Sequence, residues 1–177
     1  MADATQPGKT APAESRPSEG GLSASQRMEG LSAPKALVDG LTDGLIVAVP
    51  SNEAPLQGLA GIIDWRFHGQ VSAFHSLNPS NETLRGSQGL SGKLGEMTLM
   101  ALQHHGKIFR VLFVGIGPVP QPGIRSEAVL QTLSRPLITT LMQLGWRAPG
   151  FSSQDWGDIE LASLTRALEG RNILLFD

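Results

Sequence analysis

Two consecutive stretches of the sequence decide the fold: Asp43–Ala54, DGLIVAVPSNEA, and Pro55–Arg66, PLQGLAGIIDWR. The first contains a short apolar run, Gly44–Val49, which is rich in β-branched residues and typical of a strand covered on both faces. In the second, apolar residues recur at helical spacing as far as Phe67, which predicts a helix of about three turns. A strand followed directly by a helix indicates an α/β domain.

Downstream of this unit the sequence predicts a β-hairpin. The stretches Glu96–Gln103 (EMTLMALQ) and Lys107–Gly117 (KIFRVLFVGIG) are joined by a turn that contains a glycine. The second strand is almost entirely apolar from Val111 to Val114, so we expect it inside the sheet. The stretch between the first helix and the hairpin, residues 78–93, is rich in Gly, Asn and Ser and is predicted to be an exposed loop.

The C-terminal third predicts two helices and a last strand. Apolar residues recur at every fourth position or nearly so from Val129 to Leu144, in a helix that Pro136 either kinks or divides in two. A second helix is expected from Asp158 to Gly170, and the strand NILLFD ends the sequence. The predicted fold is therefore a three-layer α/β domain with a mixed, mostly parallel sheet flanked by helices.

The first 33 residues differ in composition from the remainder. Ala, Pro, Ser, Gly, Glu and Thr dominate them, and large apolar residues are nearly absent. Such a segment buries too little surface to offset its ordering entropy, so residues 1–33 are predicted to be a disordered tail. The alternative is an arm that becomes ordered on a partner. Residues 34–177 are predicted to form a single domain.

Composition narrows the function classes. The 177 residues carry a formal net charge of −2, which argues against a nucleic-acid partner. The absence of cysteine excludes disulfides, thiolate metal sites and a cysteine nucleophile. The sequence shows neither a signal-peptide core nor an apolar run long enough to span a membrane. We therefore expect a cytoplasmic protein without a membrane partner.

Two pairs of glycines are the candidate ligand-binding residues. Gly58 and Gly61 lie at the start of the first helix, where unpaired N–H groups can hold an anion. Gly115 and Gly117 end the buried hairpin strand, and ligands of open α/β sheets bind beyond the carboxyl ends of strands. The alternative is structural, because glycine also permits close helix–sheet packing and tight exit turns. Both pairs would share one edge of the sheet if their strands are parallel neighbours.

The polar residues do not form a recognisable catalytic motif. His104 and His105 are adjacent in the hairpin turn, where we expect them to point to opposite faces, and His68 and His75 stand alone near the first helix. No nucleophile elbow of the GxSxG type occurs, and the acidic residues near Asp155 are explained as a loop that caps a helix. We therefore predict no catalytic residue, no metal and no cofactor.

The sequence also predicts how deeply the three tryptophans are buried. Trp65 and Trp146 flank apolar stripes and are expected in the core, while Trp156 lies in a polar stretch and is expected to be partly exposed.

The stretch DGLIVAVPSNEAPLQGLAGIIDW resembles the beginning of the N-terminal domain of the leucyl (cytosol) aminopeptidase family, and FRVLFVGIGP is similar to a later strand of that domain. The resemblance implies a macro-domain-like fold over residues 38–177. In that family the metals and catalytic residues belong to a C-terminal domain that has no counterpart here, so the resemblance implies no catalytic role for any residue. The family's N-terminal domain contributes to assembly.

This resemblance leads to two hypotheses on function. The first is a non-catalytic protein-interaction or assembly module that associates with a protein partner or with itself. The second is a nucleotide or ADP-ribose binder, because macro domains hold ADP-ribose with a NAAN segment and a glycine-rich loop. Asn52 lies near the position of the last Asn of that segment, and the candidate cradle is then Asn52, Gly58, Gly61, Gly115 and Gly117.

Overall fold

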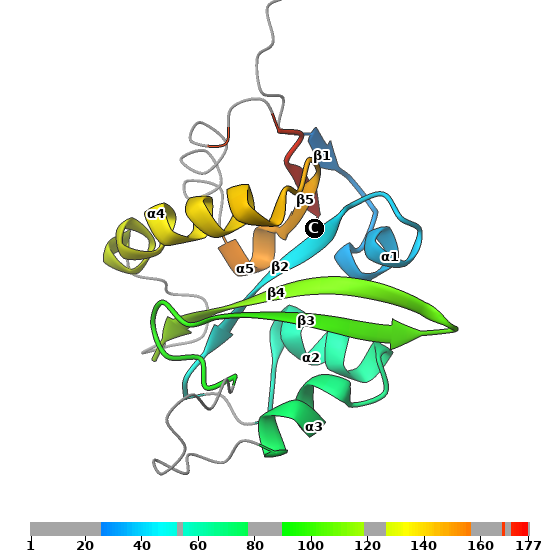
Figure 1. Ribbon diagram of the computed structural model, residues 1–177, viewed down its shortest axis with the longest axis horizontal. Coiled ribbons are helices and arrows are strands. Elements are labelled where there is room, and N and C mark those ends of the chain that lie inside the picture. Colours follow the sequence, from blue (N-terminus) through cyan, green and yellow to red (C-terminus); the bar gives the residue numbers. More distant parts are fainter. Residues whose placement is uncertain are drawn as a thin grey trace, which may run out of the picture.

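A computed structural model describes residues 26–52, 55–77, 90–118, 127–156, 168 and 171–176. These residues form a twisted sheet with helices on both of its faces (Figure 1). In chain order the elements are β1 (Gln26–Met28), α1 (Ala33–Val38), β2 (Gly44–Pro50), α2 (Gly58–Arg66), α3 (Gln70–Leu77), β3 (Met97–His104), β4 (Lys107–Gly117), α4 (Glu127–Leu144), β5 (Pro149–Ser152), α5 (Ser153–Trp156) and β6 (Leu174–Phe176).

The six strands lie in the order β1-β6-β5-β2-β4-β3. Among the strands that the structure describes, four neighbouring pairs are parallel, and β3 alone runs antiparallel, to β4. The prediction of a mixed, mostly parallel sheet is therefore confirmed, as is the hairpin. The apolar run of β4 is buried between β2 and β3, as its composition indicated.

Side chains alternate between two apolar cores along the central strands. On β2, Leu45, Val47 and Val49 pack on the face that α1, α2 and α3 cover, whereas Ile46 and Ala48 face α4. Figure 1 shows α4 on one side of the β3–β4 ribbon and α2 and α3 on the other. A strand covered on both faces needs a continuous apolar run, which explains the composition of β2.

The structure refines four of the predicted boundaries. Residues 26–33, predicted as part of the tail, form β1 and the start of α1, and β1 pairs with β6. The second half of the first helical region is a separate helix, α3, and α4 runs through Pro136 as one helix. The predicted exposed loop is wrong at Leu90, which is buried because it reaches the core beneath β2.

Two of the three tryptophan predictions are wrong. Trp146 is buried as expected, but Trp65 is 82% exposed and Trp156 is 1% exposed. The buried face of α2 is set by Ile63 and Phe67, one turn apart, and Trp65 lies midway between them on the opposite side of the helix. Trp156 packs edge-to-face with Phe151.

The predicted helix at 158–170 and the first 25 residues lie outside the described residues, apart from Leu168, which is buried. None of the described helices combines the length and the apolar character that crossing a membrane requires.

Candidate functional site

The carboxyl ends of β2 and β4 meet at one edge of the sheet. The strands are parallel neighbours, and their register pairs Val49 with Gly115 and Pro50 with Gly117. Beyond the strands, the Ser51 N–H donates a hydrogen bond of 3.0 Å to the carbonyl oxygen of Gly117. Because the two strands are parallel neighbours, the two glycine pairs share one edge of the sheet, as the sequence predicts for that arrangement. We call this edge, formed by the ends of β2 and β4 and the start of α2, the carboxyl edge.

Helix α2 begins at the carboxyl edge with a glycine in the left-handed region. Gly58 has φ of 56°, and Gln57 before it provides no side-chain cap. The first backbone bond of the helix runs from the Gly61 N–H to the Gln57 carbonyl, at 3.1 Å. The N–H groups of the residues before Gly61 consequently lack a partner within the helix, and they point out of its positive end.

A buried carboxylate stands beside this helix start. Asp155 is 6% exposed, and its Oδ2 accepts a hydrogen bond of 3.4 Å from the Ala48 N–H. Its Oδ1 lies 3.6 Å from the position that a Cβ on Gly58 would occupy. The negative charge stabilises the positive end of α2. The next residue, Trp156, is anchored to β2, because its Nε1 donates to the Ile46 carbonyl at 3.2 Å.

The segment of residues 90–95 packs its backbone against the carboxyl edge. Gly92 has φ of 69°, and its carbonyl accepts a hydrogen bond of 2.9 Å from the Gly117 N–H. A Cβ on Gly115 would stand 2.0 Å from the Lys93 carbonyl oxygen, so a glycine is required there. The exposed Lys93 is thereby carried to the same edge.

The five predicted residues fall into two groups. Asn52, Gly58 and Gly117 lie at the carboxyl edge; Asn52 and Gly58 are exposed there, whereas Gly117 is buried and its N–H and carbonyl bond to Gly92 and Ser51. Gly61 and Gly115 instead face backbone: a Cβ on Gly61 would lie 2.5 Å from the Leu56 carbonyl oxygen. Close packing against backbone therefore requires glycine at both positions, whether or not a ligand binds.

Sequence reasoning missed Asp155 and Lys93 as residues of this edge. The sequence places Asp155 in a loop that ends in a helix cap and Lys93 in a polar loop. Both reach the edge through contacts with distant residues, Ala48 and Gly115, so no local pattern marks them.

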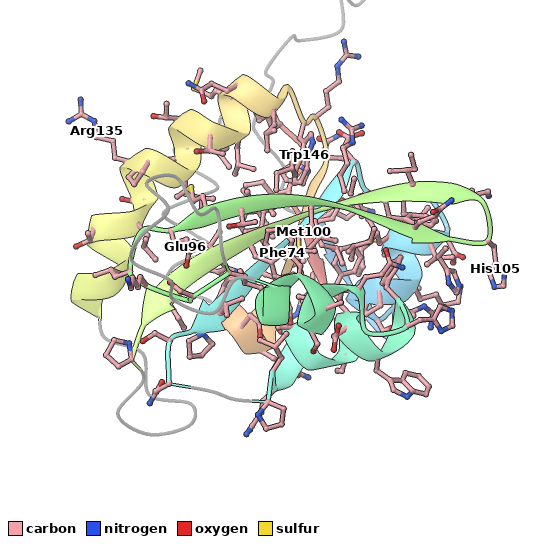
Figure 2. The ribbon with its side chains drawn as sticks, turned by 60° about the horizontal axis from the view of Figure 1, so that its bottom comes forward. Phe74, Glu96, Met100, His105, Arg135 and Trp146 are labelled. Atoms are coloured by element: carbon pink, nitrogen blue, oxygen red, sulfur yellow. The ribbon has the colours of Figure 1, made fainter. Side chains whose placement is uncertain are left out.

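A histidine cluster lies at the other end of α2. The rings of His104 and His105 contact with centroids 4.1 Å apart, and those of His68 and His104 are 5.6 Å apart. The expectations that His68 stands alone and that the adjacent pair diverges are wrong. His105 has φ of 47° because it belongs to the two-residue turn with Gly106 and not to a strand. Figure 2 shows His105 at the hairpin tip.

Within the part of the chain that the structure describes, no group of three His, Cys, Asp or Glu side chains has an arrangement that could hold a metal ion. The electrostatics of the cluster nevertheless matter for His104. Burial lowers its pKa below the usual 6.5, and the nearby His105, His68 and Arg66 lower the pKa further.

This lowered pKa predicts a pH dependence of stability. Below about pH 6.5 the unfolded chain binds a proton at His104 more readily than the folded chain does, so the unfolding free energy falls as the pH falls. We expect the Tm to drop between about pH 7.5 and pH 5.5, and we expect the drop to be smaller in His104→Gln. Scanning calorimetry across this range checks the prediction, and equal profiles for the two proteins would contradict it.

Comparison of the sequence with family models and with curated proteins found no match. Solved structures do match the fold. The macrodomain of Mycobacterium tuberculosis DarG superposes with a TM-score of 0.59 at 13% identity, covering 86% of this chain and 98% of that one. The macrodomain of Thermus aquaticus DarG gives 0.56 at 11% identity, covering 80% and 93%. These similarities show a macrodomain-like fold.

A mutant of tomato leucine aminopeptidase aligns with a TM-score of 0.49 at 15% identity, covering 76% of this chain and 29% of that one. That score is too low to support the aminopeptidase family.

Proposed function

We propose that this chain binds a nucleotide diphosphate of the ADP-ribose type at the carboxyl edge of β2 and β4. One observation carries the proposal: the exposed residues Asn52, Gly58 and Lys93 all lie at the carboxyl edge, beyond the ends of two neighbouring parallel strands. Lys93 offers a positive charge that can bind a pyrophosphate, and the first turn of α2 offers backbone N–H groups that lack a partner within the helix. The macro-domain-like fold supports the same choice of ligand class.

The charges at the edge suggest how such a ligand lies. Asp155 already places a negative charge beside Gly58, so a phosphate at that point would be repelled. The phosphates are therefore proposed to lie toward the exposed Lys93, with the Asn52 amide beside a hydroxyl or the base of the ligand. Because Asp155 is buried and bonded to the Ala48 N–H, we propose binding without chemical turnover.

Calorimetric titration with ADP-ribose tests this proposal. We expect the wild-type chain to bind, and we expect Lys93→Ala and Asn52→Ala each to weaken binding about tenfold, the effect of losing one charged or polar contact. Both residues are exposed, so their substitution is expected to leave folding intact. Lys107→Ala at the hairpin tip is the matched control, since it removes the same exposed charge away from the carboxyl edge.

Two further measurements complete this test. Absence of heat with ADP-ribose and with AMP at millimolar concentration would rule out the proposed ligand class. Chromatography of ADP-ribose after long incubation with the chain is expected to return it intact, and a new product would show that the site is catalytic.

An interaction module remains the second candidate function. The observation that favours it is a pair of large apolar side chains one turn apart on α2: Ile62 is 53% exposed and Trp65 is 82% exposed. Exposed tryptophan is a frequent anchor of protein interfaces. A cross-linked partner that is lost in Trp65→Ser and kept in Met142→Ser would support this surface, and an identical cross-linking pattern in both variants would count against it. The proposed kinship with leucyl aminopeptidases rests on the sequence motifs at 43–65 and 109–118.

A further inference from the structure

Strand β3 is an outer strand of the sheet, and no strand among the described residues pairs with its second side. It occupies the end of the strand order, and it is eight residues long (Figure 1). Its stretch Met97–Gln103, MTLMALQ, contains no charged residue and no proline. Proteins usually protect a free edge with charges, proline or a short strand, and β1 at the opposite edge has only three residues. The composition of β3 is therefore typical of a strand that pairs with other strands on both of its sides.

One side chain shows which backbone groups of β3 point outward. The amide of Gln70 imitates a neighbouring strand: its Nε2 donates to the Gln103 carbonyl at 2.7 Å, and its Oε1 accepts from the Gln103 N–H at 2.9 Å. Gln103 therefore directs its backbone groups away from β4. In an antiparallel pair this direction alternates, so Ala101, Leu99 and Met97 also direct theirs outward.

The outward-facing stretch has a defined end on each side. Gln70 occupies Gln103 at one end. At the other end, Gly115 bonds to both Glu96 and Gly95, where the regular ladder stops. Three residues with outward backbone groups remain, and Leu99 is at their centre.

We propose that β3 pairs antiparallel with β3 of a second copy of this chain, with Leu99 facing its own counterpart across a two-fold axis. In this register Met97 faces the partner's Ala101, and about six hydrogen bonds join the two strands. Gln103 takes no part, so the Gln70 amide stays in place. The two sheets become one continuous sheet, and the contact closes at a dimer because a two-fold interface is isologous.

A copy of the same strand suits this edge better than a strand of different composition. Self-pairing places like residues near one another, which is unfavourable for charged strands and harmless for an uncharged one. Apolar surface on the α4 side of the hairpin supports the pairing as well. Leu99 is 46% exposed and Ile108 is 71% exposed, and both lie on that face. On the other face, Met100 packs near Phe74 of α3 (Figure 2).

Light scattering coupled to size exclusion, with the full chain at concentrations from about 10 to 200 µM, tests the proposal. We expect a species of twice the 18.8 kDa chain mass. Leu99→Lys opposes two charges at the two-fold axis, and Ala101→Pro removes an outward N–H that no bond within the sheet uses; both are expected to be monomers with unchanged circular dichroism. Met142→Lys, which places the same charge on an exposed position of α4, is expected to remain a dimer.

Hydrogen exchange supplies an independent readout. The amides of residues 97, 99 and 101 are expected to exchange more slowly in the dimer than in Leu99→Lys. A monomer at every concentration would overturn the proposal, as would a dimer that both β3 substitutions leave intact. Slow exchange of these amides in a monomer would show that another part of the same chain covers the edge, which also overturns it.

Discussion

Replacing Trp156 with alanine is expected to lower the free energy of unfolding by about 3–5 kcal/mol. The indole is 1% exposed and packs edge-to-face against Phe151. Its removal leaves a cavity in the core between β2 and α4, and it also deprives the Ile46 carbonyl of the 3.2 Å hydrogen bond from Nε1. Denaturation by urea, followed by circular dichroism, measures the change.

The matched control is the same substitution at Trp65. Because that side chain is 82% exposed, Trp65→Ala is expected to change the unfolding free energy by less than about 0.5 kcal/mol. Comparing the two variants separates the effect of burial from the effect of residue type, since each variant loses one indole. Comparable losses in the two variants would contradict the placement of the two tryptophans.

Replacing Trp156 also has an expected effect on the carboxyl edge. Asp155 precedes it in α5 and faces Gly58 at the start of α2. The milder Trp156→Phe retains an aromatic ring but loses the hydrogen bond to the Ile46 carbonyl. If the proposed ligand binds at this edge, Trp156→Phe is expected to weaken its binding because Asp155 and the first turn of α2 lose their support.

The substitution Gly115→Ala is expected to destabilise the fold by about 3 kcal/mol, the upper end of the usual cost of over-packing. The added Cβ would lie 2.0 Å from the carbonyl oxygen of Lys93, and both groups belong to backbone that cannot rotate away. Either β4 moves away from β2, with which it forms the longest parallel pairing of the sheet, or residues 90–95 leave the carboxyl edge. Thermal and urea unfolding of the variant check this expectation.

Gly106→Ala is the control for this substitution. Gly106 has φ of 74°, but an added Cβ meets no atom within 4 Å. Gly106→Ala is therefore expected to lower the free energy of unfolding only by the cost of placing an L-residue in the left-handed region, about 1–2 kcal/mol. A loss at Gly115 no larger than the loss at Gly106 would mean that residues 90–95 do not pack on β4 as described.

Much of the fold follows from local patterns in the sequence. The continuous apolar run of β2, the helical spacing from Leu59 to Phe67 and the hairpin turn at Gly106 each depend on neighbours within a few residues. Periodicity reports such features directly, because it shows which positions share a face of one element. The sequence also located the glycine turns that end β4 and begin α2, although it left open whether their role is packing or binding.

The tertiary structure decided the contacts between elements that lie far apart in the chain. Asp155 reaches the Ala48 N–H across 107 residues, and Gln70 reaches the backbone of Gln103 across 33. Hydrophobicity along the chain carries no information about such pairings, since they depend on the order of the strands. The same order makes β3 an outer strand, and the packing of α2 and α5 on the sheet buries Trp156 and leaves Trp65 in solvent.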